Sequence, residues 1–282
     1  MCETCGCGNK DEVKIHDPLH THHHDDAHVH VHEHDHGHDH DHEQDRGHHH
    51  SHDHPHTHDH SHQKVVDLNL DILAGNNMTA AMNRRFFEGR RVLCLNMVSS
   101  PGSGKTTILE KTINHLAGSK KLVVIEGDQQ TMLDADRIEK AGAQALQINT
   151  GSGCHLDAQM IDSSLKKLDP DVNSFLFIEN VGNLVCPAMF DLGEFKRVLV
   201  ISVTEGEEKP LKYPLIFESS QLCIINKSDL LPHVDFRMDE FIKNAALVNP
   251  HLEFITLSAK TGEGMDLWYE WILSQAEIFL SH

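Results

Sequence analysis

The segment Ser99-Ser100-Pro101-Gly102-Ser103-Gly104-Lys105-Thr106-Thr107 is the most informative part of this chain. It follows a short apolar run at 92–98 and precedes a segment, 106–116, with the apolar spacing of a helix. A glycine-rich turn that ends in Lys-Thr, between a strand and a helix, is typical of a phosphate-binding loop. Ser99 stands where the pattern has its first glycine, so an ordinary Gly-rich turn is the alternative. We expect the nucleotide phosphates to contact Gly102, Ser103, Gly104, Lys105, Thr106 and Thr107.

Short apolar runs alternate with helical patterns along the rest of the chain. Runs at 92–98, 122–125, 145–148, 175–178, 198–203, 222–225 and 254–257 predict buried strands, and helices are expected at 106–116, 156–168, 235–247 and 264–280. This alternation predicts an α/β fold with a mainly parallel seven-stranded sheet covered by helices. An amphipathic helical lead-in is expected at 65–90, so that the nucleotide-binding domain spans 65–282.

The region before this domain has an unusual composition. Residues 16–62 contain 22 of the 27 histidines and 11 carboxylates against the single Arg46, within a chain of 282 residues with a formal net charge of −19. Such a tract contributes no core, and we predict a disordered, metal-binding region; a solubilising tail or a pH-sensitive spacer is the alternative. Residues 1–15 hold a separate cysteine motif.

Composition also excludes several classes of protein. No basic stripe is present to neutralise nucleic-acid phosphates, so nucleic acid is not an expected partner. No apolar run approaches the roughly 20 residues that span a membrane. The scattered cysteines do not resemble a disulfide framework. The sequence therefore predicts a cytoplasmic protein with no membrane partner.

The identity of the base is predicted from Asn226-Lys227-Ser228-Asp229, which follows the run at 222–225. Guanine presents two adjacent donors that the carboxylate of Asp229 can accept together, whereas adenine presents an acceptor at N1. The stem of Lys227 can lie across the ring. A third segment, Ser258-Ala259-Lys260, can close on the base from the other side. GTP is therefore favoured over ATP.

Two acidic residues at the ends of predicted strands are candidates for sensing magnesium and the γ-phosphate. Asp128 follows the run at 122–125, and Glu179 follows the run at 175–178. Carboxylates in such positions can hold Mg²⁺ or its waters, with Thr106 as a further ligand; capping of neighbouring loops is the alternative. We expect the catalytic residues to be Lys105, Thr106, Asp128 and Glu179. The sequence contains no evident catalytic base, which predicts slow intrinsic GTP hydrolysis.

Two groups of soft ligands suggest metal sites. Cys154-His155 follows a Gly-rich loop, and Cys186 lies seven residues after Glu179. Three ligands leave a Ni²⁺ or Zn²⁺ site one short of four, so a water, a second subunit or the recipient of the metal would complete it. The second group, Cys2, Cys5 and Cys7, offers three thiolates within six positions. Core packing or chance is the alternative for the first group, and a frayed terminus with unpaired thiols for the second.

The motifs together resemble the HypB family, GTPases that assist nickel insertion into [NiFe]-hydrogenase. The resemblance covers the whole chain. It includes the phosphate-binding segment and the following stretches: Met1-Cys2-Glu3-Thr4-Cys5-Gly6-Cys7, Glu126-Gly127-Asp128-Gln129-Gln130-Thr131, Thr150-Gly151-Ser152-Gly153-Cys154-His155-Leu156-Asp157-Ala158, Glu179-Asn180-Val181-Gly182-Asn183-Leu184-Val185-Cys186-Pro187, Thr204-Glu205-Gly206-Glu207 and Asn226-Lys227-Ser228-Asp229.

This resemblance implies a SIMIBI-class P-loop GTPase that forms a GTP-dependent homodimer. It also implies a nickel or zinc site at Cys154, His155 and Cys186 near the subunit interface, and a tight nickel site at the amino-terminal cysteines. The implied partners are a HypA-type nickel chaperone and the hydrogenase large-subunit precursor.

Three functions remain open at this stage. In the first, GTP hydrolysis alters the geometry at Cys186 and helps to deliver Ni²⁺ to the hydrogenase precursor. In the second, the histidine tract and the amino-terminal thiolates store nickel, and the GTPase regulates docking. In the third, the chain serves another nickel enzyme such as urease, or has a cobalamin-type chaperone role.

Overall fold

A computed structural model describes residues 14–16, 61–128, 133–151 and 153–281. Seven of the strands are those that the apolar runs predict, and they are parallel to one another: β2 Leu93–Ser99, β3 Leu122–Asp128, β4 Gln144–Asn149, β5 Phe175–Gly182, β6 Lys196–Ser202, β7 Leu222–Asn226 and β8 Glu253–Thr256. Among the described residues the strand order is β1-β4-β3-β5-β2-β6-β7-β8. The predicted α/β fold with a mainly parallel sheet is confirmed.

One edge of the sheet differs from the prediction. The short strand β1, Lys14–His16, pairs antiparallel with β4, Lys14 opposite Asn149 and His16 opposite Gln147. The described sheet therefore has eight strands, and His16 belongs to it although the sequence assigned that residue to the tract. A three-residue strand is too short to give a recognisable alternation, which explains why the apolar pattern does not predict it.

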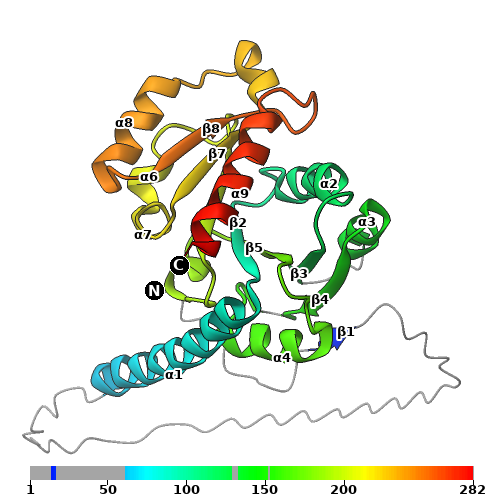
Figure 1. Cartoon of the computed structure of the whole chain (residues 1–282). Helices are drawn as coiled ribbons and strands as arrows, with labels where there is room; N and C mark the ends of the chain where they lie inside the picture. Colours follow the sequence, from blue (N-terminus) through cyan, green and yellow to red (C-terminus); the bar gives the residue numbers. More distant parts are fainter. Residues whose placement is uncertain (1–13, 17–60, 129–132, 152, 282) are drawn as a thin grey trace, which may run out of the picture.

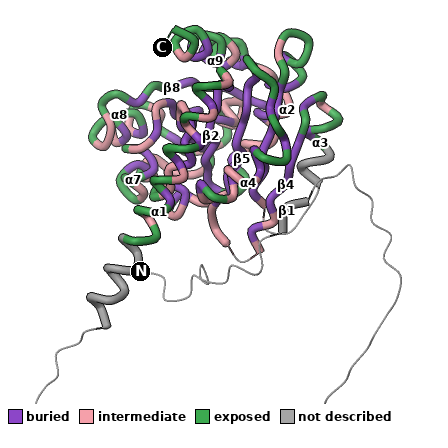
Figure 2. Tube along the Cα trace, turned by 60° about the horizontal axis from the view of Figure 1, so that its bottom comes forward, coloured by how far each residue is buried: buried purple, intermediate pink, exposed green. Residues whose placement is uncertain are grey.

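Helices cover both faces of the sheet (Figure 1). One face packs against α2 Lys105–Leu116, α3 Leu133–Ala141 and α9 Met265–Leu280. The other face packs against α1 Ser61–Arg90, α4 Ala158–Leu168, α7 Pro214–Glu218 and α8 Met238–Val248. The short helices α5 Cys186–Met189 and α6 Lys209–Lys212 and the 3₁₀ helix η2 Ser228–His233 complete the described elements. The central strands between these layers are buried, as Figure 2 shows, whereas the edge strand β8 leaves Glu253 and Thr256 exposed.

The strand β2 lies at the centre of the sheet, and all seven of its residues are buried. Its neighbours are β5 and β6, which lie on opposite sides of it. In parallel sheets of this kind, ligands bind beyond the carboxyl ends of the strands where the strand order reverses. The loop after β2 therefore lies where the topology predicts a ligand site.

The lead-in predicted at 65–90 forms the single helix α1, which begins at Ser61. Its inner face includes Asn83 and Phe87, which are 1% and 2% exposed, whereas the apolar side chains of Ile72, Met78 and Met82 are 51%, 74% and 62% exposed. The helix therefore packs on the domain with a face that is partly polar. No helix in the described part of the chain is long and apolar enough to cross a bilayer.

Candidate nucleotide and metal sites

The phosphate-binding loop connects β2 to α2 in the way that the sequence predicts. The loop ends at Gly104, which has a left-handed φ of 95°, and α2 begins at Lys105. A Cβ atom at Gly104 would lie 2.3 Å from Nδ2 of Asn226, so glycine is required both for the turn and for the close approach of Asn226. The amides at the start of α2 consequently face the space beyond the strands, where an anion is favoured.

Glu179 contacts the two functional side chains of this loop. Thr106 Oγ1 donates to Glu179 Oε1 at 2.6 Å, and Lys105 Nζ lies 3.2 Å from the same oxygen. Glu179 Oε2 is buried and makes no hydrogen bond with any described residue. A buried carboxylate oxygen beside a threonine hydroxyl is a donor set that suits Mg²⁺ or one of its waters. Residues 106 and 179 therefore fit a magnesium-bound nucleotide.

A cavity of about 460 Å³ lies over this loop. Its lining includes all six predicted phosphate-contacting residues, Asp128 and Glu179, and it also includes Cys154. A second cavity, of about 190 Å³, shares Gly104 and Thr107 with the first. The two cavities therefore adjoin each other, as the predicted phosphate and base sites require.

The second cavity is lined by the residues from which guanine recognition is predicted, including Asn226, Lys227, Asp229, Ala259 and Lys260. Ser258 Oγ donates to Asp229 Oδ1 at 2.6 Å, which holds the carboxylate in place. Asn226 has a bracing role, because its Nδ2 donates to Ser103 O at 2.8 Å and its Oδ1 accepts from the amide of Ala259 at 3.0 Å. Asn226 therefore connects the phosphate-binding loop to the loop from which base recognition is predicted.

Lys227 differs from Asn226 in what it contacts. Its Nζ donates to Gly102 O at 2.7 Å, and the residue lines the second cavity. Its backbone is left-handed, with φ of 63°. This arrangement is compatible with the predicted contact between the lysine stem and the flat face of a base.

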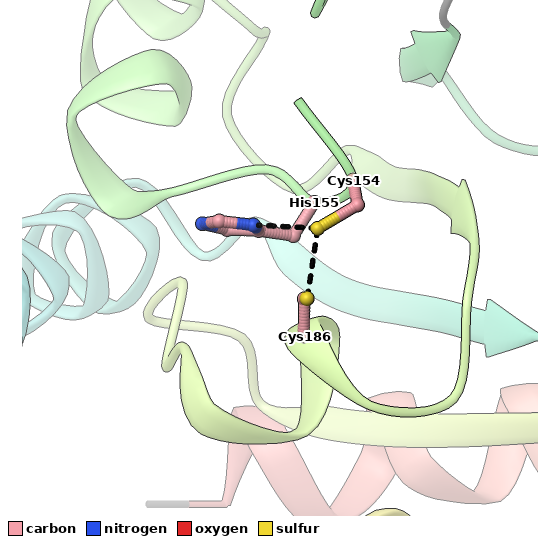
Figure 3. Close-up of side chains that lie close together, drawn as sticks. All are labelled: Cys154, His155 and Cys186. Atoms are coloured by element: carbon pink, nitrogen blue, oxygen red, sulfur yellow. Dashed lines mark hydrogen bonds between the residues drawn. The ribbon is translucent and has the colours of Figure 1, made fainter. Parts of the chain in front are cut away.

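The structure brings together the three metal-ligand candidates of the domain. Figure 3 shows the sulfur of Cys154 directed toward that of Cys186, which lies on a separate segment, with the ring of His155 beside the Cys154 sulfur. The Cys154 and Cys186 sulfur atoms are 2.8 Å apart, His155 Nδ1 is 3.7 Å from Cys154 Sγ, and the ligand atoms of all three residues lie within 4.8 Å of one another. Among the described residues this is the cluster with the geometry to hold a metal ion.

Burial of the cluster affects whether its side chains can bind a metal ion. Burial lowers the pKa of His155, against a smaller opposing effect of Asp157, so the imidazole is neutral and able to ligate at neutral pH. The ring stacks on Phe190 with centroids 3.9 Å apart, which restricts its orientation. In contrast, Cys94 and Cys223 are fully buried in strands, and burial raises the pKa of both thiols, as expected for core cysteines.

Several residues at these sites were not predicted to be functional. Glu126 pairs in register with Glu179. Glu126, Arg137 of α3 and Asn183 all line the larger of the two cavities. Arg137 also forms a bidentate pair with Glu110. The alternation Glu126-Gly127-Asp128 could have identified a second acidic side chain at this strand end, but no local pattern identifies Arg137. The candidates Cys2, Cys5 and Cys7, and the tract from residue 17 to 60, lie outside the described residues.

Comparison with known proteins agrees with the resemblance seen in the motifs. A family model described as CobW/HypB/UreG, nucleotide-binding domain, matches residues 93–256. The hydrogenase maturation factor HypB of Rhizobium leguminosarum bv. viciae is 56% identical over 210 residues, which cover 74% of this chain and 70% of that protein.

Two solved structures are similar along most of their length. The crystal structure of the hydrogenase maturation factor HypB from Archaeoglobus fulgidus has a TM-score of 0.68 at 38% identity and covers 72% of this chain and 99% of that one. The crystal structure of HypB from Helicobacter pylori in complex with nickel has a TM-score of 0.69 at 36% identity and covers 72% and 95%. The chain therefore belongs to the CobW/HypB/UreG family of P-loop nucleotide-binding proteins, and within it to the HypB hydrogenase maturation factors.

Proposed function

We propose that this chain is a GTP-hydrolysing nickel metallochaperone that binds, stores and helps to deliver Ni²⁺ to the [NiFe]-hydrogenase large-subunit precursor. The observation that carries the proposal is the position of Glu179. Its carboxylate contacts both Lys105 and Thr106, and Cys186 lies seven residues further along the same segment. A carboxylate that touches the γ-phosphate site is thus connected by a short length of chain to a metal ligand.

Asn183 strengthens this connection, because it lines the nucleotide cavity and contacts both ligand segments. Its Nδ2 donates to Cys154 O at 3.4 Å, and its Oδ1 accepts from the amide of Val185 at 2.8 Å. Movement of Asn183 when the γ-phosphate leaves would alter the spacing between Cys154 and Cys186. Switch segments of other nucleotide hydrolases respond to the γ-phosphate in this manner.

The proposed chemistry assigns a role to each group. Lys105 and the loop amides would neutralise the phosphates, and Thr106, Asp128 and Glu179 would hold Mg²⁺, which would stabilise the charge that develops on the phosphoryl oxygens. Nickel is the cargo, held by Cys154, His155 and Cys186, with Zn²⁺ as a competing ion of similar ligand preference. Asp229 selects guanine, with Ser258 fixing its carboxylate.

The proposed assembly is a GTP-dependent homodimer that receives nickel from a HypA-type chaperone and acts in the cytoplasm. Relatives named hydrogenase maturation factors support the hydrogenase precursor as recipient. The related H. pylori protein is named a hydrogenase/urease maturation factor, which keeps urease as an alternative recipient. Restoration of urease activity but not of hydrogenase activity in a deletion strain would favour that alternative.

Nickel titration in two nucleotide states tests the coupling. The full chain is titrated with Ni²⁺ in the presence of GDP or of a non-hydrolysable GTP analogue, with Cys186→Ser as the control that removes the site. We expect affinities that differ about tenfold, which requires only ~1.4 kcal/mol of differential binding. Equal affinities in the two states would show that nucleotide and metal are not coupled.

The histidine tract supports storage as a second function, because 22 histidines within 47 residues provide far more imidazole than one delivery site uses. Deletion of residues 16–62 separates the two functions. A store loses most of its bound nickel on deletion, whereas a delivery factor still supports hydrogenase maturation when nickel is plentiful. A maturation assay with and without excess nickel measures the difference.

A further inference from the structure

Helix α1 contacts both of the segments that carry metal ligands, and it does so through asparagine side chains. Oδ1 of Asn76 accepts from the amide of Ala158 at 2.9 Å, and its Nδ2 donates to Asp191 O at 2.8 Å. A single amide group therefore bridges the segment that follows His155 and the segment that follows Cys186.

Asn83, two turns further along α1, repeats this bridge. Its Nδ2 donates to Ala158 O at 2.9 Å and to Leu192 O at 3.0 Å. Both hydrogens of its amino group are used, and the residue is 1% exposed. A buried amide with both donors engaged fixes the distance between its two acceptors, because the loss of either bond would leave a buried polar group unsatisfied.

The bridged atoms lie close to the metal ligands along the chain. Ala158 is three residues after His155, and Asp191 directly follows Phe190, whose ring stacks on the His155 imidazole. Nη2 of Arg84, also on α1, donates to both carboxylate oxygens of Asp191, at 2.9 Å each. Figure 1 shows α1 and α4 side by side beneath the sheet. Helix α1 therefore lies where it can hold the two segments at a fixed distance.

We infer that Asn76 and Asn83 are positioning residues of the metal site, through which α1 sets the spacing between the Cys154–His155 pair and Cys186. The inference rests on the proposed nickel site. A shift of α1 relative to the domain would move the two ligand segments apart, and it would change nickel affinity and geometry without altering any ligand. The polar inner face of α1 has this role in addition to packing.

The test uses the full chain with Cys2→Ser, Cys5→Ser and Cys7→Ser, so that the remaining thiolate ligation of Ni²⁺ comes from the domain. The thiolate-to-nickel charge-transfer absorption reports the site, and the same chain with Cys186→Ser defines the background. Asn76→Ala and Asn83→Ala are compared with Thr79→Ala. Thr79 is the control because its hydroxyl donates within α1, to Gly75 O at 3.3 Å.

We expect each asparagine variant to bind Ni²⁺ about tenfold more weakly and to shift the charge-transfer band, while GTP affinity and the Thr79→Ala variant stay at the parent values. A role in packing alone would lower the melting temperature and leave the band in place. The inference is overturned if folded asparagine variants keep the parent affinity and band, or if Thr79→Ala weakens nickel binding equally. Asn76→Ala decides the question if Asn83→Ala does not fold.

A parent protein without a Cys186-dependent band would refute the proposed nickel site, and this inference with it. A parent protein with the band, combined with unaffected asparagine variants, would refute the positioning role and leave the nickel site standing. The two failures are therefore distinguishable in one experiment.

Discussion

Replacing Asp229 by asparagine should change the preferred base from guanine to xanthine. The carboxylate lines the smaller cavity and is held by the Ser258 hydroxyl at 2.6 Å. Guanine presents N1–H and an exocyclic amine, which are two donors for two carboxylate oxygens. Asparagine presents one acceptor and one donor, and xanthine presents N1–H and a carbonyl oxygen at C2, so the substituted site is complementary to xanthine.

The size of the effect follows from the hydrogen bonds that are lost. A hydrogen bond to a charged group contributes about 1.5–3 kcal/mol, so disrupting two of them removes about 3–6 kcal/mol from GTP binding. At ~1.4 kcal/mol for each factor of ten, GTP affinity should fall by roughly 10²–10⁴. XTP, which the carboxylate repels, should become the tighter ligand.

Competition of GTP, XTP and ATP against a fluorescent nucleotide measures this change. Asp235→Asn, an exposed aspartate a few residues away, is the matched control and should leave the order of affinities unaltered. If Asp229→Asn weakens GTP and ATP equally and gives no advantage to XTP, the carboxylate does not read the base, and the assignment of the smaller cavity is wrong.

Three further predictions concern buried or paired charges. Glu179→Gln should lower GTP turnover by about 10²–10³ with a smaller effect on GTP binding, because the change removes charge beside the phosphoryl group; phosphate release and nucleotide titration separate the two. Arg197→Met should lower the free energy of unfolding by about 3–5 kcal/mol, since it leaves Glu194 buried and unpaired, and Glu194→Met in the same chain should restore most of the loss in urea denaturation. Asp191→Asn should destabilise the domain at pH 7 but not in acid. Burial raises the pKa of Asp191, but the Gly193 amide and Arg84 outweigh burial and lower that pKa. The stabilisation is therefore present above the unfolded pKa of 3.8 and is lost as pH falls through the lower folded pKa.

The positions of the phosphate-binding loop and of the predicted base-binding loop could be expected from sequence because each pattern is local. Consecutive residues supply the amides, the lysine and the hydroxyl, and the flanking strand and helix orient them. The prediction of β2 at 92–98 differs from the observed Leu93–Ser99 by one residue at each end. The helix predicted at 156–168 begins at Ala158 because Asp157 caps it, accepting from the amide of Met160 at 2.8 Å.

Other features depend on contacts between distant parts of the chain, which no local pattern encodes. The hydrogen bonds of Asn76 and Asn83 to the 191–192 segment span 115 and 109 residues. The same limit applies to α1, which was predicted as an amphipathic helix but leaves the apolar side chains of Met78 and Met82 exposed. Apolar spacing shows that a helix has faces but does not identify the surface that each face meets.

The position of Cys154 would allow the proposed nucleotide and metal sites to be coupled over a short distance. It lines the cavity that also contains Lys105 and Glu179, and its sulfur is 2.8 Å from that of Cys186. Coupling between distant sites requires an element with two arrangements that both ligands bias. In the proposed arrangement the loop before α4 and the end of β5 contact both the nucleotide and the metal ion. A displacement of these two segments by the γ-phosphate would therefore act directly on a side chain that binds the metal. Helix α1 contacts the opposite ends of the same two segments. Because those ends would stay fixed, a small movement at the phosphate would change the spacing between the metal-binding side chains.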